Sequence, residues 1–471
     1  MMNRYITTAI PYVNGVPHIG HAIDYCLADT CARYFRLRGD NVRFQVGTDE
    51  YGGKISQKAK DLGVPVEKYV LENSNKFRDF IENLNISYTD FIRTTDELHE
   101  KRCQKIWQKL RDHIYLAKYK GWYCTGCERF VTAKEYEENN GVCPDHQKAY
   151  DELEEENYYL KISDFKQKIQ DAILSGEMAI LPDFRKKEIL RLLEESPDVS
   201  ISRPRTQLKW GVSVPNDESQ VMYVWIDALS NYITVLGYPD VDISEWWPAT
   251  AQFVGKDILR FHAIIWPAML LGIGLPLPKA IVSHGMVLSD GQKMAKSIGN
   301  VVDPIDVINR YGLDAFRYYF LRHIDTFSDS DFTWDKYESA YSNELANDLG
   351  NLVQRLAVLA SKNGIHADIG EKSELDVEYV ALMDKYEFSK ALDYVWGKIQ
   401  ELNRKIDEEK PWNLAKNGET SQLEKCMTEL ITGLLDANRM LGPFLPNVTE
   451  KISAVFAGEI TPPKTPLFPK E

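Results

Sequence analysis

The sequence lacks any hydrophobic run long enough to cross a membrane. Its longest apolar stretch, from Ile264 to Leu277, is interrupted by prolines and glycines and falls short of the roughly 20 residues that a membrane-spanning helix needs. The N-terminus also lacks the basic and apolar regions of a secretory signal peptide. With 44% hydrophobic and 27% charged residues, the composition is typical of a soluble globular chain. We therefore expect a cytoplasmic protein without a membrane partner.

Excess positive charge and a disulfide framework are also missing. The chain has 56 basic and 70 acidic residues and a net charge of −14, so any RNA must bind through local basic patches. Its seven cysteines are odd in number and three of them cluster, which favours a reducing compartment and a metal site over disulfides. No internal repeat or long low-complexity segment is visible. The 471 residues suffice for about three domains.

The clustered cysteines have the spacing of a zinc site. Cys124 and Cys127 form one Cys-x-x-Cys pair, and Cys143 and His146 form a second pair with the same spacing. Two such pairs, joined by a short ribbon, can converge on one tetrahedral Zn²⁺. All four ligands come from the protein and leave no open position, so the pattern predicts one structural zinc ion per chain. The alternative is two unrelated pairs of reduced side chains.

The stretch from Thr7 to His21 joins a strand pattern to a helix pattern. Residues 3–10 are strand-like, a turn rich in Pro, Asn and Gly follows, and a helical period begins at about His18. The start of a helix favours an anion, because free backbone N–H groups and the helix dipole point the same way. Gly20 leaves room for a ligand, and the two histidines can donate hydrogen bonds to phosphate oxygens. Taken alone, the pair also fits two ordinary surface histidines.

A second strand follows this helix. Val42, Phe44 and Val46 alternate with other residues, and the strand pattern ends in Gly47–Glu50. A strand–helix–strand unit places its two strands parallel, with a right-handed crossover. Ligands of such sheets bind beyond the carboxyl ends of the strands. Asp49 is therefore expected at the same edge as the two histidines.

The rest of the chain divides into three regions. The α/β pattern is interrupted from 117 to 221, resumes as a strand pattern at Val221, and continues with strands at 251–254 and 280–284. From Lys336 the helical period dominates. We expect an α/β domain of residues 1–116 and 222–335, an insertion of residues 117–221, and an α-helical bundle of residues 336–471.

Two histidines at a helix start and two lysines on a distant loop form a two-part signature. With His18-Ile-Gly-His21 and Lys293-Met-Ala-Lys296-Ser297, the sequence resembles the class I aminoacyl-tRNA synthetases. Over essentially its whole length it is similar to the methionyl-tRNA synthetases of that class. The stretches that carry this similarity are Ala9-Ile-Pro-Tyr-Val-Asn-Gly, Gly47-Thr-Asp-Glu, Tyr223-Val-Trp-Ile-Asp-Ala, Gly255-Lys-Asp-Ile-Leu-Arg-Phe-His and Asn351-Leu-Val-Gln-Arg355. Ala295 stands where the family usually has Ser.

The resemblance implies a Rossmann-like parallel-sheet catalytic domain with a zinc-binding connective insertion, followed by a helical anticodon-binding domain. It also implies that ATP activates L-methionine to methionyl-adenylate, which then esterifies the 3′-terminal adenosine of tRNA(Met). Because the reacting α-phosphate is crowded and highly charged, such catalysis depends on positioning and charge stabilisation. The residues expected to bind ATP, which enters with Mg²⁺, are His18, Gly20, His21, Lys293, Lys296 and Ser297; the two histidines and two lysines are the expected catalytic groups.

A methionine pocket is implied in the same way. Its expected residues are Ile10, Tyr12, Asp49, Trp225, Ala228, Tyr232, Ile258 and His262. Asp49 would bind the substrate ammonium, and aromatic rings favour a thioether by about 0.3–1.5 kcal/mol each. Ordinary core packing is the alternative role for the aromatic residues. The short insertion disfavours a valyl, isoleucyl or leucyl enzyme, because such enzymes often carry a large editing domain to reject close analogues.

The resemblance further assigns the anticodon to Asn351, Arg355 and Trp412. Trp412 can stack on an unpaired base, for about 1–3 kcal/mol, and the other two residues lie one helical turn apart. Bundle packing and a surface ion pair are the alternative. The expected partners are L-methionine, ATP and tRNA(Met), and we expect a monomer.

Three other functions share parts of these patterns. A small-molecule nucleotidylyltransferase has the same histidine signature but needs neither a zinc insertion nor a helical bundle. A cysteine-activating enzyme would place zinc at the substrate thiol. A non-catalytic RNA-binding relative would not need the histidines and lysines.

Overall fold

The computed structural model describes residues 1–469 except 128, 132, 290, 295–301 and 367–373. Six parallel strands form its central sheet, in the order β3-β2-β1-β12-β13-β7. Their bounds are β1 Asn3–Thr8, β2 Asn41–Thr48, β3 Asp90–Arg93, β7 Ala179–Leu181, β12 Ala251–Gly255 and β13 Ala280–His284. The strands predicted near residues 3, 42, 251 and 280 are confirmed, and the first two are parallel as expected.

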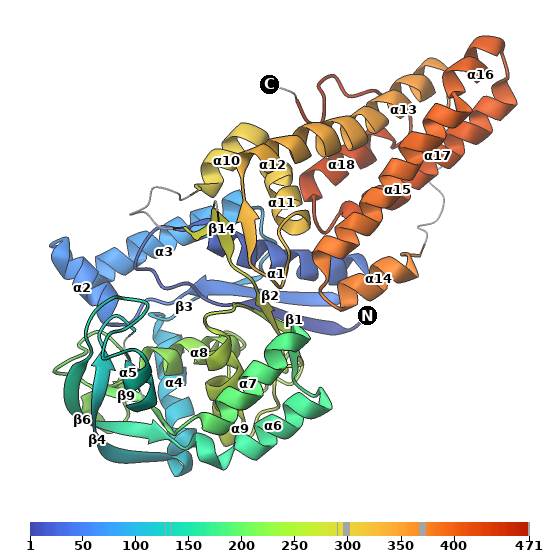
Figure 1. Ribbon diagram of the computed structural model, residues 1–471. Helices are drawn as coiled ribbons and strands as arrows, with labels where there is room; N and C mark the ends of the chain where they lie inside the picture. The colour runs from blue at the N-terminus through green and yellow to red at the C-terminus, as the bar shows by residue number, and fades with distance from the viewer. Residues whose placement is uncertain (128, 132, 290, 295–301, 367–373, 470–471) are drawn as a thin grey trace.

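The sheet is buried on both faces, because alternate side chains along its strands enter two different apolar cores. Tyr5 faces a core that includes α4 (Glu97–Leu110), α8 (Val224–Thr234) and α9 (Trp266–Gly272). Its neighbour Ile6 faces the other core, with α1 (Ile19–Leu37) and α11 (Leu313–Arg322). Helices α2 (Gly53–Asp61) and α3 (Val66–Asn83) extend along one side of the domain that contains the central sheet (Figure 1).

The insertion contains two small antiparallel sheets, in the orders β5-β4-β6-β8 and β10-β11-β9. Its strands are β4 Ile114–Cys124, β5 Arg129–Val131, β6 Asp151–Leu160, β8 Val199–Ser200, β9 Ser202–Pro204, β10 Ser213–Val214 and β11 Asp217–Met222. Its helices are α5 Ala133–Glu138, α6 Lys166–Ser175 and α7 Asp183–Glu195, with a 3₁₀ turn at Ile162–Asp164. Another 3₁₀ turn, Arg111–His113, precedes β4. Between these pieces the chain returns to the central sheet, where β7 pairs with β13.

The prediction of a strand from Val221 onward holds only for Val221 and Met222 and is wrong after them. β11 ends at Met222, and α8 begins at Val224. A short apolar run such as this one fits a buried strand and a buried helix equally well, so periodicity alone could not decide.

The C-terminal half begins with a small sheet, β15-β14-β16, and becomes helical. The elements before the bundle are β14 Val287–Ser289, β15 Gln292–Lys293, β16 Ser330–Phe332, α10 Pro304–Tyr311 and α12 Trp334–Ser339. The bundle helices are α13 Asn351–Lys362, α14 Val377–Asp384, α15 Phe388–Glu409, α16 Pro411–Asn417, α17 Thr420–Leu441 and α18 Pro446–Val455. Two segments are π-helical, Phe261–Ile265 and Ala340–Gly350. The bundle extends as an arm away from the central sheet, with α16 at its far end (Figure 1).

A buried ion pair joins the arm to the sheet domain. Arg317 on α11 lies 2.8 Å from the Asp29 carboxylate on α1, and both side chains are fully buried. The same guanidinium donates to the backbone oxygens of Phe444 (2.7 Å) and Pro443 (3.1 Å), just before α18. Among the described helices, none is both long and apolar enough to span a bilayer.

Candidate functional site

The two signature histidines form a stacked pair at the start of α1. His18 is the N-cap, His21 lies in the first turn, and their ring centroids are 3.8 Å apart. His18 Nδ1 accepts from the Gly20 backbone N–H (3.2 Å), and His21 Nδ1 accepts from the His18 backbone N–H (3.1 Å). Because Nδ1 is the acceptor in both rings, each neutral imidazole carries its proton on Nε2. The pair can therefore present two N–H donors to one anion.

His21 is held in the neutral form. Burial lowers its pKa well below the ordinary histidine value, and the neighbouring His18 lowers it further by repulsion. Phe77 on α3 packs edge-on against the His21 ring, with centroids 5.1 Å apart. At neutral pH this histidine can act as a hydrogen-bond donor but not as a fixed positive charge.

The predicted lysine loop follows the end of β13. β14 begins three residues after His284, and the β14–β15 hairpin places Leu288 opposite Lys293. Gly291 in its turn has a φ of +72° and donates its N–H to Asp331 (2.8 Å). Lys296, Ser297 and Ala295 lie outside the described residues.

Tyr12 and Asp49 meet where the chain leaves β1 and β2. They form a parallel bridge, Asp49 N–H donates to Pro11 O (2.8 Å), and Val13 N–H donates to Asp49 O (3.1 Å). Asp49 is buried. Ile10 is close by, since a Cβ at Gly47 would lie 3.1 Å from its Cγ2.

Tyr232 and His262, two further residues of the expected pocket, contact each other. The Tyr232 hydroxyl lies 2.7 Å from His262 Nε2, and His262 Nδ1 lies 3.0 Å from the Ile258 carbonyl. A carbonyl only accepts, so Nδ1 carries the proton and Nε2 accepts from the tyrosine. Burial lowers the pKa of His262 to about 4, although the Ile258 carbonyl opposes the shift. Trp225 and Ala228 precede Tyr232 on α8.

The sequence did not single out two groups near these residues. Phe261 stacks on Trp225, with ring centroids 3.9 Å apart and an angle of 7° between the rings. In the sequence, its position next to His262 is the signal that could have indicated a role in the pocket. Asp24 and His284 form a buried pair 3.3 Å apart between α1 and the end of β13. Burial lowers the pKa of His284, but the Asp24 carboxylate, the Gly285 carbonyl and the Asp257 charge together outweigh burial, and the pKa is raised.

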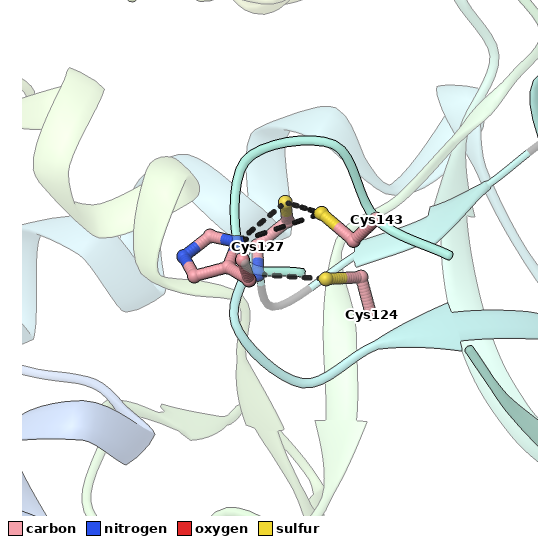
Figure 2. A group of neighbouring side chains, drawn as sticks. Cys124, Cys127 and Cys143 are labelled. Carbon is pink, nitrogen blue, oxygen red and sulfur yellow. Dashed lines mark hydrogen bonds between the residues drawn. The ribbon is translucent and has the colours of Figure 1, made fainter. Parts of the chain in front are cut away.

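The predicted metal ligands form one cluster. The ligand atoms of Cys124, Cys127, Cys143 and His146 all lie within 4.8 Å of one another. Cys127 Sγ is 3.6 Å from Cys143 Sγ and 3.4 Å from His146 Nδ1, and Figure 2 shows the three sulfur atoms around one point. Four ligands about 2.3 Å from a tetrahedral metal stand roughly 3.8 Å apart, so the cluster fits a single metal ion.

Gly126 is required by this geometry. A Cβ at this position would overlap the ring of His146, so only glycine lets the Cys-x-x-Cys turn approach the fourth ligand. All seven cysteines are free of disulfides.

The expected anticodon residues lie on α13 and α16 of the arm, which extends away from the central sheet (Figure 1). Arg355 on α13 places its guanidinium 5.4 Å from the Trp412 ring centroid and pairs with Asp407 (2.6 Å). Trp412 is 40% exposed at the start of α16. Asn351 is exposed one turn before Arg355 and contacts Asn347 (3.4 Å).

Comparison with known proteins gives a consistent result over nearly the whole chain. The family model described as tRNA synthetases class I (M) matches residues 4–152 and 145–357. The methionine–tRNA ligase of Thermotoga maritima is 38% identical over 98% of this chain and 76% of its own length, and that of Listeria monocytogenes serotype 4b is 41% identical over 94% and 70%.

Solved structures agree. Mycobacterium tuberculosis methionyl-tRNA synthetase in complex with methionyl-adenylate is 34% identical, with a TM-score of 0.91 over 100% of both chains. The apo form of the same enzyme gives a TM-score of 0.84 at 31% identity. The architecture is therefore the expected one, with a parallel-sheet domain, an insertion whose cysteine–histidine cluster could hold a metal ion, and a C-terminal helical region. By sequence and by structure, the chain belongs to the class I tRNA synthetase family (M).

Proposed function

We propose that the protein is a methionine–tRNA ligase that makes methionyl-adenylate beside the His18–His21 pair. The observation that carries this proposal is the pair of Nε2–H donors at the start of α1, in a chain similar at full length to an enzyme solved with methionyl-adenylate. The methionine carboxylate attacks the α-phosphorus of ATP, and pyrophosphate leaves. A hydroxyl of the terminal adenosine then attacks the acyl carbon, and AMP leaves.

Each part of the site has a role in this proposal. His18, His21 and the backbone at Gly20 bind ATP phosphates, and neutral donors suit a phosphate that changes charge as the bond to pyrophosphate breaks. Lys293, Lys296 and Ser297 contact the leaving phosphates. Mg²⁺ supplies additional charge neutralisation to the ATP phosphates.

The methionine pocket is assigned to two groups of residues. Asp49 binds the ammonium group, and Ile10 and Tyr12 lie beside it. The thioether lies among the residues Trp225, Ala228, Tyr232, Ile258 and His262. The Tyr232–His262 hydrogen bond satisfies both polar groups internally, so they present a neutral surface to an apolar side chain.

The metal cluster is assigned to one structural Zn²⁺. Three thiolates and one imidazole form a typical closed tetrahedral zinc set, and closed coordination leaves no position for a substrate. We further assign the 336–471 arm to anticodon binding through Asn351, Arg355 and Trp412. The α/β regions 1–116 and 222–335 hold the catalytic centre, with the connective insertion at 117–221.

The direct test is methionine-dependent ATP–pyrophosphate exchange by the wild-type chain and by His21→Ala. The variant should lose exchange by at least about a hundredfold, because it removes a donor that acts on the reacting phosphates. His366→Ala, an exposed histidine outside the site, serves as the matched control and should keep wild-type exchange. Wild-type exchange in the His21 variant would reject the assigned site.

A further inference from the structure

Trp210 connects the insertion to the turn that follows β2. It lies between β9 and β10, and its indole N–H donates to the Glu50 backbone oxygen (2.7 Å). In return, the Gly52 backbone N–H donates to the Trp210 oxygen (3.3 Å). The Trp210 and Tyr51 rings are 5.1 Å apart. One residue of the insertion thus contacts all three residues that come directly after Asp49.

The other side of this turn is packed against Tyr12. Gly52 has a φ of +122°, and a Cβ there would overlap the Tyr12 hydroxyl. Tyr12 in turn bridges to Asp49. The turn is therefore enclosed between Trp210 and Tyr12, so a shift of the indole is expected to move the turn against Tyr12.

Trp210 also belongs to an apolar cluster that borders the histidine pair. Trp210 and Tyr12 both pack against a small apolar cluster that includes Val13 and Phe77. Phe77 is the ring that supports His21. Glu50 is fully buried and is held by an ion pair with Arg93 (2.7 Å), so the turn is fixed on the side away from Trp210.

We propose that Trp210 is a positioning residue for the amino-acid substrate. Through Glu50 and Gly52 it fixes the placement of Asp49 and Tyr12, so the insertion forms part of the wall that shapes the methionine pocket. This inference rests on the proposed function. Trp210 touches neither reacting atoms nor metal ligands, and its effect is therefore expected in substrate affinity.

The test compares Trp210→Phe with Trp122→Phe in steady-state exchange. Trp210→Phe keeps an aromatic ring but leaves the Glu50 oxygen without its donor, which should raise KM for methionine about tenfold. Because the phenylalanine ring can keep the packing against the cluster that includes Phe77, kcat and KM for ATP should stay within about twofold of the wild-type values. Trp122 lies in the same insertion, stacked on Tyr136 with centroids 4.1 Å apart, and its variant should leave KM for methionine unchanged.

Trp210→Ala, which removes the ring as well, should raise KM for methionine further; if it does not fold, the phenylalanine variant decides. A Trp210→Phe protein with wild-type KM for methionine and a lowered melting temperature would make Trp210 purely structural and overturn the inference. Equal rises in KM for methionine and for ATP would also overturn it. A wild-type chain without methionine-dependent exchange would instead reject the proposed function on which the inference rests.

Discussion

Gly126 is a residue outside the ligand set on which the metal cluster depends. It lies between two ligands of the Cys-x-x-Cys turn and directly beneath the His146 ring. Gly126→Ala should push the imidazole out of the cluster and lower zinc affinity by at least about tenfold, as loss of ligand orientation does in other metal sites. Competition with a chromophoric chelator measures this affinity.

Gly397 provides the control for that experiment, because it lies within α15 and a Cβ there would contact nothing within 4 Å. Gly397→Ala should keep wild-type zinc affinity. Unchanged affinity in Gly126→Ala would show that the four side chains do not hold the metal together.

His262 makes the stability of the protein depend on pH. Burial lowers its folded-state pKa to about 4, whereas an unfolded histidine titrates near 6.5. Between these values the unfolded chain binds a proton that the folded chain does not, so stability falls as pH falls from about 6.5 to about 4. His262→Gln should remove about 1–2 kcal/mol of the loss seen between pH 7 and pH 5. Urea unfolding at both pH values measures this difference, and an identical loss in both proteins would contradict the assigned shift.

Some site residues were predictable because their position follows from local pattern. His18 and His21 begin the helix that follows the first strand and its turn, and Asp49 comes directly after the second strand, so a parallel arrangement brings them to one edge. The contacts of Trp210 with Glu50, and of Asp24 with His284, join residues far apart in sequence. Nothing in the spacing of those residues indicates that they meet.

Helices α13 and α16 carry the proposed RNA contact at the far end of the arm. Trp412 is exposed there and packs on Arg355 rather than in the bundle core. Trp412→Ala should reduce tRNA charging by about tenfold or more, since stacking on one base contributes about 1–3 kcal/mol. Methionine-dependent exchange should not change, because the site of adenylate formation is remote.

Trp334 provides the control for Trp412. It is 42% exposed, close to the 40% of Trp412, and it lies on α12 rather than on α13 or α16. Trp334→Ala should charge tRNA normally. If Trp412→Ala loses exchange and charging in parallel, the residue stabilises the fold and does not read RNA.

Element length decided which strands could be predicted. β1, β2, β12 and β13 have five to eight residues and a clear buried pattern. β7 has only three residues and lies inside the region expected as an insertion, yet it pairs with β13 in the central sheet. Three residues carry too little periodicity to be separated from a turn, so the return of the chain to the sheet is visible only in three dimensions.

The Asp29–Arg317 pair connects the sheet domain with the arm. It joins α1, whose first turn carries the histidines, to α11 and to the backbone before α18. Arg317→Met should lower the free energy of unfolding by about 3 kcal/mol or more, because it leaves a buried carboxylate without its main partner. Adding Asp29→Asn should recover part of that loss. Urea unfolding of both proteins measures it, and a stable single variant would show that the pair does not connect the two parts.

The most direct measurement is ATP–pyrophosphate exchange by the wild-type chain with a panel of amino acids. The proposed pocket predicts rapid exchange with methionine, and little with cysteine, leucine, isoleucine or valine. Exchange with cysteine in place of methionine, or with no amino acid at all, would contradict the assigned activity.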